Sequence, residues 1–374
     1  MNVLFDSKFE AMTHKVLHIL TSLDFGGVER HMELIASWRG TGQYSHEFLA
    51  IGSGGAAEAS IARSGCSVCC LNINPKIPNL RALWRLYKYI IKAAPYVVHT
   101  HGAEANFHGL IASRIAGVPV RVGEEIGIPA RTRTASQIFR FVFSLANVLV
   151  AVSAVVERWL LDNGEVKSRK IKVLNCPVAF NRIRPSQKTF GDEFVVCWVG
   201  RLEKVKNPIA VLHAFARFST SRPDTKLWII GDGSLRSELE DQIKELGLQD
   251  VVELMGYLPD PESIIINADL FVQSSHSEGF SLALVEAMGI GLPVIVSNVG
   301  AAKEIVSDGI SGWIIDEPTV DRIYNSLVVA YSMSSEALHQ MGFIAADAVR
   351  KKHSLDIYME HLHVLYSQHS AIMR

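Results

Sequence analysis

Two patterns of hydrophobic and polar positions alternate along most of the chain. Short, β-branched apolar runs predict buried strands, and the stretches between them carry apolar residues at helical spacing. In the first half the predicted strands are 15–23, 46–51, 67–73, 96–100, 118–122, 147–152 and 170–174, and the predicted helices are 27–38, 56–63, 79–93, 104–116, 135–145 and 154–162. Strands separated by helices of this length indicate βαβ units and a parallel sheet covered on both faces.

A second series of the same kind follows a stretch without clear period, 175–186, which contains two prolines and indicates a linker. The second series predicts strands at 194–199, 226–230, 251–255, 269–273, 293–297 and 313–315, and the chain closes with helices near 319–332, 334–351 and 355–369. Residues 1–11 precede the first strand as an extension.

The predicted fold class is therefore α/β, with two Rossmann-like, doubly wound parallel-sheet domains facing a central cleft. We expect the first domain to span residues 1–182 and the second 183–352, with a last helix at about 353–374 packing back on the first domain. In such sheets, ligands bind at the carboxyl ends of the strands.

Composition narrows the function classes. The 374 residues are 48% hydrophobic and 20% charged, which excludes a disordered chain. No apolar run reaches the ~18 residues of a membrane helix, and Asp6 and Glu10 argue against a secretory signal. Five cysteines fit a reducing compartment, so we expect a cytoplasmic location.

The near-neutral net charge of −1 hides two halves of opposite sign. Residues 1–185 carry 22 Lys+Arg against 13 Asp+Glu, and the rest carry 15 against 25. The basic first half suggests an anionic partner, and the alternative is attraction between the two domains. A basic stripe at helical spacing (Arg81, Arg85, Lys88 and Lys92) suggests contact with anionic lipid on the inner membrane face, and the alternative there is a solvated helix face. No recognition motif for nucleic acid accompanies the charge.

Two motifs follow strands of the second half. Glu278 lies in the turn before a predicted helix, and Glu286 lies about 8 Å further along that helix. The free N–H groups between them can hold a diphosphate, while the carboxylates accept hydrogen bonds from hydroxyls. The alternative is a helix-start charge and a surface residue.

Arg201 and Lys206 follow the strand 194–199 and reach the same edge of the sheet, where two cations can neutralise a leaving diphosphate. No Asp-x-Asp pair is present to hold a divalent ion on phosphates, and neither G-x-G-x-x-G nor a P-loop follows a strand, so we expect no metal or other cofactor.

Together these motifs resemble the retaining GT-B glycosyltransferases of family 4. The resemblance covers almost the whole chain and is strongest between about 195 and 316. It rests on Gly200-Arg201 with Lys206, Gly231-Asp232-Gly233, Gly256-Tyr257, Glu278-Gly279 with Glu286-Ala287-Met288, Gly291-Leu292-Pro293, and Gly26-Gly27-Val28-Glu29-Arg30.

The resemblance implies a role for each matching residue. Arg201 and Lys206 would bind the donor diphosphate, Glu278 would face the sugar hydroxyls, and Glu286 would hold the ribose. The other donor-binding positions that it implies are Gly26, Gly27, Gly231, Tyr257, Gly279, Phe280, Ser281 and Leu282.

One departure concerns the first domain. Family members often carry a histidine after this strand of the first domain, whereas here the stretch reads Val122-Gly123-Glu124-Glu125, without a histidine. Either Glu124 or Glu125 is expected to contact the sugar or to receive the acceptor's proton. The alternative is that both are surface carboxylates. We expect His101 to line the cleft and His99 to pack on the sheet. A metal pair of these two histidines lacks a third ligand at suitable sequence spacing.

The predicted function is transfer of a sugar, with retained configuration, from a nucleoside diphosphate sugar (UDP-linked favoured) to a hydroxyl of a saccharide or lipid-linked acceptor. The expected setting is cell-surface polysaccharide or glycolipid synthesis. The alternatives are a nucleotide-sugar epimerase of the same fold and a non-catalytic sugar-nucleotide binder.

Overall fold

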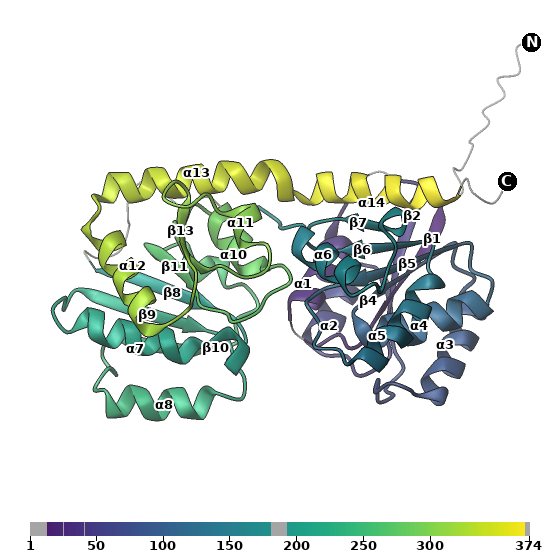
Figure 1. Ribbon diagram of the computed structural model, residues 1–374, viewed down its shortest axis with the longest axis horizontal. Helices are drawn as coiled ribbons and strands as arrows, with labels where there is room; N and C mark the ends of the chain where they lie inside the picture. Colours follow the sequence, from purple (N-terminus) through teal and green to yellow (C-terminus); the bar gives the residue numbers. More distant parts are fainter. Residues whose placement is uncertain (1–12, 25, 41, 181–192, 371–374) are drawn as a thin grey trace, which may run out of the picture.

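The computed structural model describes residues 13–24, 26–40, 42–180 and 193–370, which form two parallel sheets with helices on both faces (Figure 1). The predicted extension at 1–11, the boundary between 182 and 183 and the second half of the predicted linker lie outside the described residues.

The first sheet has all its described strands parallel. Its spatial order is β3 (Ser67–Cys70), β2 (Tyr44–Ala50), β1 (His14–Leu20), β4 (Val97–His101), β5 (Val120–Glu125), β6 (Val148–Ala151) and β7 (Ile171–Val173). Alternate residues of β1 enter different cores: Val16 and Leu20 pack on one face, Leu17 and Ile19 on the other. Burial on both faces explains the continuous apolar runs in the sequence.

Helices cover the two faces of this sheet. The core with Val16 is closed by α1 (Gly27–Ser37) and α2 (Ala56–Arg63), and the opposite face is covered by α3 (Leu80–Ala93), α4 (Ala103–Ile115), α5 (Arg133–Ser144) and α6 (Ala154–Asp162). A short 3₁₀ turn, Ser168–Lys170, leads into β7.

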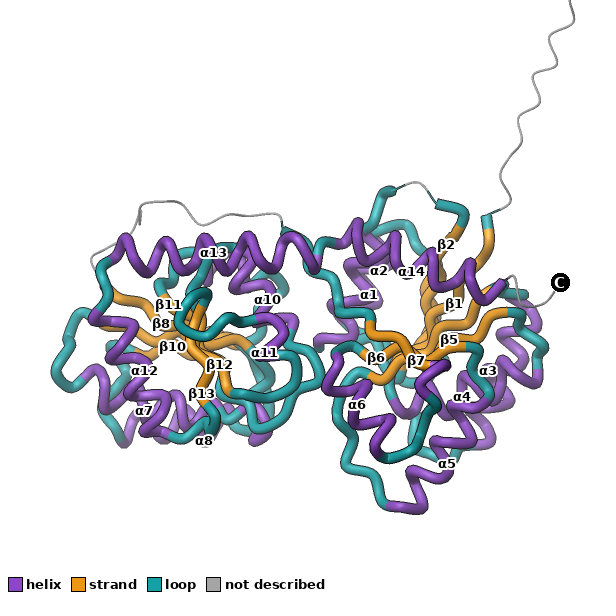
Figure 2. Tube along the Cα trace, turned by 45° about the horizontal axis from the view of Figure 1, so that its top comes forward, coloured by secondary structure: helices purple, strands orange, loops and turns teal. Residues whose placement is uncertain are grey.

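The second sheet repeats the architecture. Its order is β10 (Val252–Gly256), β9 (Thr225–Ile230), β8 (Phe194–Val199), β11 (Leu270–Gln273), β12 (Val294–Ser297) and β13 (Gly312–Ile315), all parallel. One face packs on α7 (Pro208–Ser219), α8 (Arg236–Glu245) and α12 (Val320–Ser332), and the other on α9 (Glu262–Ile265), α10 (Leu282–Gly289) and α11 (Ala302–Ile305). Figure 2 shows each sheet enclosed by its helices.

The chain crosses back between the domains through its last two helices. α13 (Ser335–His353) lies along the second domain, and α14 (Leu355–Ser370) buries Met359, Leu362 and Tyr366 in the core of the first (Figure 1). Where the helices meet, the Val178 amide donates to the His353 carbonyl at 2.8 Å. Both described crossings between the domains therefore run side by side.

All the predicted strands form, with ends shifted by a few residues. The largest consequence is at β5, which continues through Glu124 and Glu125 instead of ending at 122. Both carboxylates therefore belong to the buried strand and not to the loop after it.

Candidate active site

A cleft of about 1230 Å³, open to solvent, lies between the two domains at the carboxyl ends of both sheets. The loop after β1 and the start of α1 form its first-domain wall, and the loops after β8, β9, β10 and β11 form the opposite wall. This is the position at which doubly wound sheets bind ligands.

Two helix N-termini open into this cleft. Gly26 caps α1 with a positive φ of 156°, and Ser281 caps α10, its hydroxyl accepting from the Leu284 amide at 3.3 Å. The helices approach closely, because a Cβ added to Gly27 would stand 3.8 Å from Leu282 Cδ1. Unpaired N–H groups and the positive dipole ends make this part of the cleft suited to an anion.

Lys206 and Glu278 form an ion pair on the second-domain wall. Lys206 Nζ lies 2.5 Å from Glu278 Oε1, which also accepts from the Ser275 hydroxyl at 2.7 Å. The Lys206 carbonyl is fixed by the Ser274 hydroxyl at 3.0 Å, so the turn Lys204–Lys206 after β8 is tied to the loop after β11. The pair places a cation and an oriented carboxylate at the cleft surface.

Glu286 lies in the second turn of α10 and meets the first domain across the cleft. Its Oε1 lies 3.6 Å from Nε of Arg30 on α1. Burial raises the pKa of Glu286, and the neighbouring Arg30 opposes that shift. A buried carboxylate with one long ion pair retains oxygen lone pairs that can accept hydrogen bonds from a vicinal diol.

Arg201 is exposed in the loop after β8 and lines the cleft opposite the start of α1. On that facing helix, burial raises the pKa of Glu29, while the Ser22 hydroxyl, 3.3 Å from it, and the positive charge of Arg201 act the other way. Arg201 and Lys206 thus supply two cations to a cleft whose first-domain wall carries carboxylates.

The structure brings most of the predicted site residues together. Those that line the cleft are Gly26, Gly27, Arg201, Lys206, Gly231, Tyr257, Glu278, Phe280, Ser281, Leu282 and Glu286. Gly279 lies where the domains touch: a Cβ there would stand 2.2 Å from the Ile126 carbonyl oxygen and 2.7 Å from Gly127 Cα. Position 231 also requires glycine, because a Cβ there would lie 1.8 Å from the Gly200 carbonyl oxygen.

Three predicted site residues lie elsewhere. Glu124 is buried, 2.8 Å from His101 Nδ1, and Glu125 is buried 2.5 Å from Arg131. None of Glu124, Glu125 and His101 is among the described residues that line the cleft. Because β5 runs through both glutamates, their side chains point to opposite faces of the sheet, which separates them from the cleft.

Sequence reasoning missed the charged residues that the first domain adds to the cleft, namely Asp24, Glu29, Arg30 and Glu33. The motif Gly26–Arg30 was recognised for its glycines alone. Helical spacing places positions i, i+3 and i+4 on one face, so Arg30 and Glu33 near the start of α1 were the available signal.

Two facing parallel-sheet domains define the GT-B class of fold when the cleft between them is lined by helix N-termini and by cations after a strand, here Arg201 and Lys206. Residues 179–343 match the family described as glycosyl transferases group 1, and residues 26–177 match the glycosyl transferase 4-like domain. The chain belongs to this glycosyltransferase family, and it is a glycosyltransferase.

Its similarity to known proteins extends over most of the chain. An Escherichia coli UDP-Gal:α-D-GlcNAc-diphosphoundecaprenol α-1,3-galactosyltransferase is 30% identical over 69% of this chain and 72% of its own. The Staphylococcus aureus capsular polysaccharide biosynthesis glycosyltransferase CapM is 24% identical over 77% and 81%. Anabaena Alr3699/HepE in complex with UDP and glucose superposes with a TM-score of 0.80 at 21% identity, over 95% and 99% of the two chains.

Proposed function

We propose that the enzyme transfers a hexose, with retention of configuration, from a UDP-sugar to a hydroxyl of a saccharide or lipid-linked acceptor in cell-surface polysaccharide or glycolipid synthesis. The observation that carries the proposal is the meeting of Lys206, Glu278 and the start of α10 in one cleft with Arg201 and Glu286. The names of the E. coli and S. aureus relatives support the acceptor class, and the first of them supports UDP.

In the proposed complex the donor diphosphate lies between the cations and the helix amides. Arg201 and Lys206 contact its oxygens and stabilise the charge that develops as UDP leaves. The amides of Gly279–Leu282 contact phosphate or sugar, and Gly26 and Gly27 let the first domain's backbone approach the phosphates closely.

Glu278 and Glu286 have different proposed partners because their surroundings differ. Glu278, held by Lys206 and Ser275, accepts hydrogen bonds from hydroxyls of the transferred sugar. Glu286, about two turns of chain further on, accepts the ribose hydroxyls, and Tyr257 and Leu258 border the base. The departing phosphate takes the acceptor's proton on the same face of the sugar, which gives retention.

The first test is a panel of nucleotide sugars scored by thermal stabilisation, since a ligand that binds only the folded state raises its melting temperature. The selected donor is then incubated with saccharide and undecaprenyl-linked acceptors. Acceptor-dependent release of UDP supports transfer. Conversion of the donor without an acceptor indicates the epimerase, and tight binding with no turnover indicates the non-catalytic binder; either result contradicts the proposal.

We further propose that the first domain rests on anionic membrane through α3 and α5. On α3 the large apolar residues Trp84 and Ile91 are 52% and 53% exposed, and on α5 Phe141 is 61% exposed. Neither helix contains an acidic residue, and α3 carries the basic stripe. Exposed aromatic residues beside cations are typical of helices that lie in the membrane interface. No described helix is long and apolar enough to cross the bilayer.

The membrane proposal is tested by sedimentation with phosphatidylglycerol vesicles and with phosphatidylcholine vesicles. We expect binding to the anionic vesicles only, weaker at high salt and weaker in the double variant Trp84→Ser/Ile91→Ser. The control is Phe343→Ser, which removes a side chain that is 63% exposed on α13 in the other domain. Equal binding by all three proteins, or binding by none, contradicts the proposal.

A further inference from the structure

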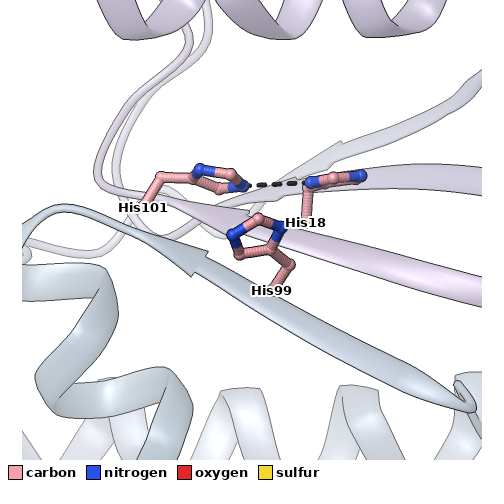
Figure 3. A group of neighbouring side chains, drawn as sticks. All are labelled: His18, His99 and His101. Atoms are coloured by element: carbon pink, nitrogen blue, oxygen red, sulfur yellow. Dashed lines mark hydrogen bonds between the residues drawn. The ribbon is translucent and has the colours of Figure 1, made fainter. Parts of the chain in front are cut away.

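Three histidines gather inside the first domain, away from the donor cleft. We call His18, His99 and His101 the histidine cluster (Figure 3). His18 on β1 pairs in register with His99 on the neighbouring strand β4, and His101 follows on the same face two residues later. All three are at most 2% exposed. They lie beneath α14, and none of them lines the cleft.

The ring nitrogens of the cluster converge. His18 Nδ1 lies 3.0 Å from His101 Nε2, and the two rings point at each other edge to edge (Figure 3). Two imidazoles bound to one tetrahedral metal at ~2.0–2.1 Å have nitrogens about 3.3 Å apart. The potential ligand atoms of all three residues lie within 4.8 Å of one another. The His99 ring lies tilted against the His101 ring, with centroids 4.3 Å apart, and its Nε2 lies 3.2 Å from the Glu124 carboxylate. A torsion change of the His99 side chain can turn this nitrogen from Glu124 to the metal.

The outward nitrogens of the cluster have polar partners. His101 Nδ1 lies 2.8 Å from the Glu124 carboxylate, His18 Nε2 lies 2.9 Å from His46 Nδ1, and His99 Nδ1 lies 2.9 Å from the Tyr366 hydroxyl. Metal-binding histidines characteristically use their second nitrogen in this way, because the partner fixes the ring and its tautomer.

The ligand type also suits a first-row metal, because imidazole nitrogen is a common protein ligand of Zn²⁺ and related dications.

We propose that the histidine cluster is a binding site for a divalent transition metal, with Zn²⁺ the best match, and that Glu124 and Tyr366 are its outer partners. Because Tyr366 belongs to α14, the metal secures the crossing helix to the first sheet. Three imidazoles leave the fourth tetrahedral position to a water, and the site stands apart from the transfer reaction. The proposal departs from the sequence-based expectation of no metal site, which rested on the lack of a third ligand near His99 in the sequence.

The rival arrangement is a hydrogen-bonded chain of imidazoles without metal. A second group of potential ligands, His31, Glu124 and Cys176, shares the same carboxylate, so the experiment must separate the two groups.

The test uses the full chain without a histidine tag, stripped with chelator and dialysed. Zn²⁺ is titrated in against a chromophoric chelator, bound metal is counted by mass spectrometry, and Co²⁺ is added to a separate sample. We expect about one Zn²⁺ per chain, a higher melting temperature with Zn²⁺, and the visible absorption bands of tetrahedral Co²⁺.

The variants His18→Gln and His101→Gln should each weaken Zn²⁺ binding at least tenfold. The control variants His361→Gln, an exposed position on α14, and Cys176→Ser should leave it unchanged. Failure of the wild-type protein to bind Zn²⁺ or to give the Co²⁺ bands overturns the proposal, and this result does not depend on any variant folding. Loss of binding in Cys176→Ser, with binding retained in the cluster variants, also overturns it.

Discussion

Replacing Lys206 by methionine removes one positive charge from the donor cleft and keeps most of the side chain's volume. In the wild-type protein this ammonium lies 2.5 Å from the Glu278 carboxylate, whose side chain is only 8% exposed. In Lys206→Met the carboxylate keeps the Ser275 hydroxyl, 2.7 Å away, but it faces the donor diphosphate without a cation between them.

Two effects set how much activity Lys206→Met loses. Removing one group that stabilises developing charge costs about 2.7–4 kcal/mol, or roughly 10²–10³ in kcat. Repulsion between Glu278 and the leaving phosphate adds to this cost, since like charges about 4 Å apart near a protein surface interact by about 4 kcal/mol before solvent and counterions weaken the effect. We therefore expect a decrease in kcat/KM near 10³.

The assay is acceptor-dependent release of UDP from the donor selected by thermal stabilisation, with melting temperature as the check on folding. Lys204→Met is the matched control, because Lys204 lies on the same turn but is not among the described residues that line the cleft. The double variant Lys206→Met/Glu278→Gln measures the energetic coupling between the two side chains of the ion pair. Its activity should be no lower than that of the less active single variant.

The proposed role of Lys206 is refuted if Lys206→Met is folded and retains kcat/KM within about threefold of the wild-type value, or if Lys204→Met loses as much activity. If the effects of the two single substitutions add up in the double variant, only the coupling between Lys206 and Glu278 is refuted.

Three further predictions concern other contacts. Burial raises the pKa of Glu286, so its charged form costs folding free energy at pH values above the raised pKa and none below the ordinary pKa of 4.5. Glu286→Gln should weaken UDP binding about tenfold, by calorimetry, because the ribose hydroxyls lose the charged carboxylate that accepts their hydrogen bonds. Because the variant has no carboxylate to protonate, its loss of UDP affinity on acidification should be shallower. Gly279→Ala should lower kcat/KM at least tenfold, because the added methyl meets first-domain backbone, whereas Gly127→Ala, with open space around its Cβ, should be near wild type. Arg131→Met leaves two buried carboxylates without their cation and should cost about 3–5 kcal/mol in urea unfolding, against less than about 0.5 kcal/mol for the exposed control Arg133→Met.

The sequence by itself determined the two-sheet architecture and the second-domain wall of the cleft. Apolar runs are continuous where both faces of a parallel strand are buried, so periodicity alone identified the strands. The sequence also predicts four cleft residues, because each follows a strand or lies near the start of a helix, and the carboxyl ends of parallel strands meet at one edge: Arg201, Lys206, Glu278 and Glu286.

Only the tertiary structure decided which first-domain side chains reach the cleft. The strand β5 was extended by two glutamates that look like loop residues in the sequence but are paired with His101 and Arg131 in the interior. Arg30 reaches Glu286 from a different domain, and His18 joins His99 through strand pairing across about eighty residues of chain. Such contacts depend on sheet register and domain packing, which local sequence patterns do not encode.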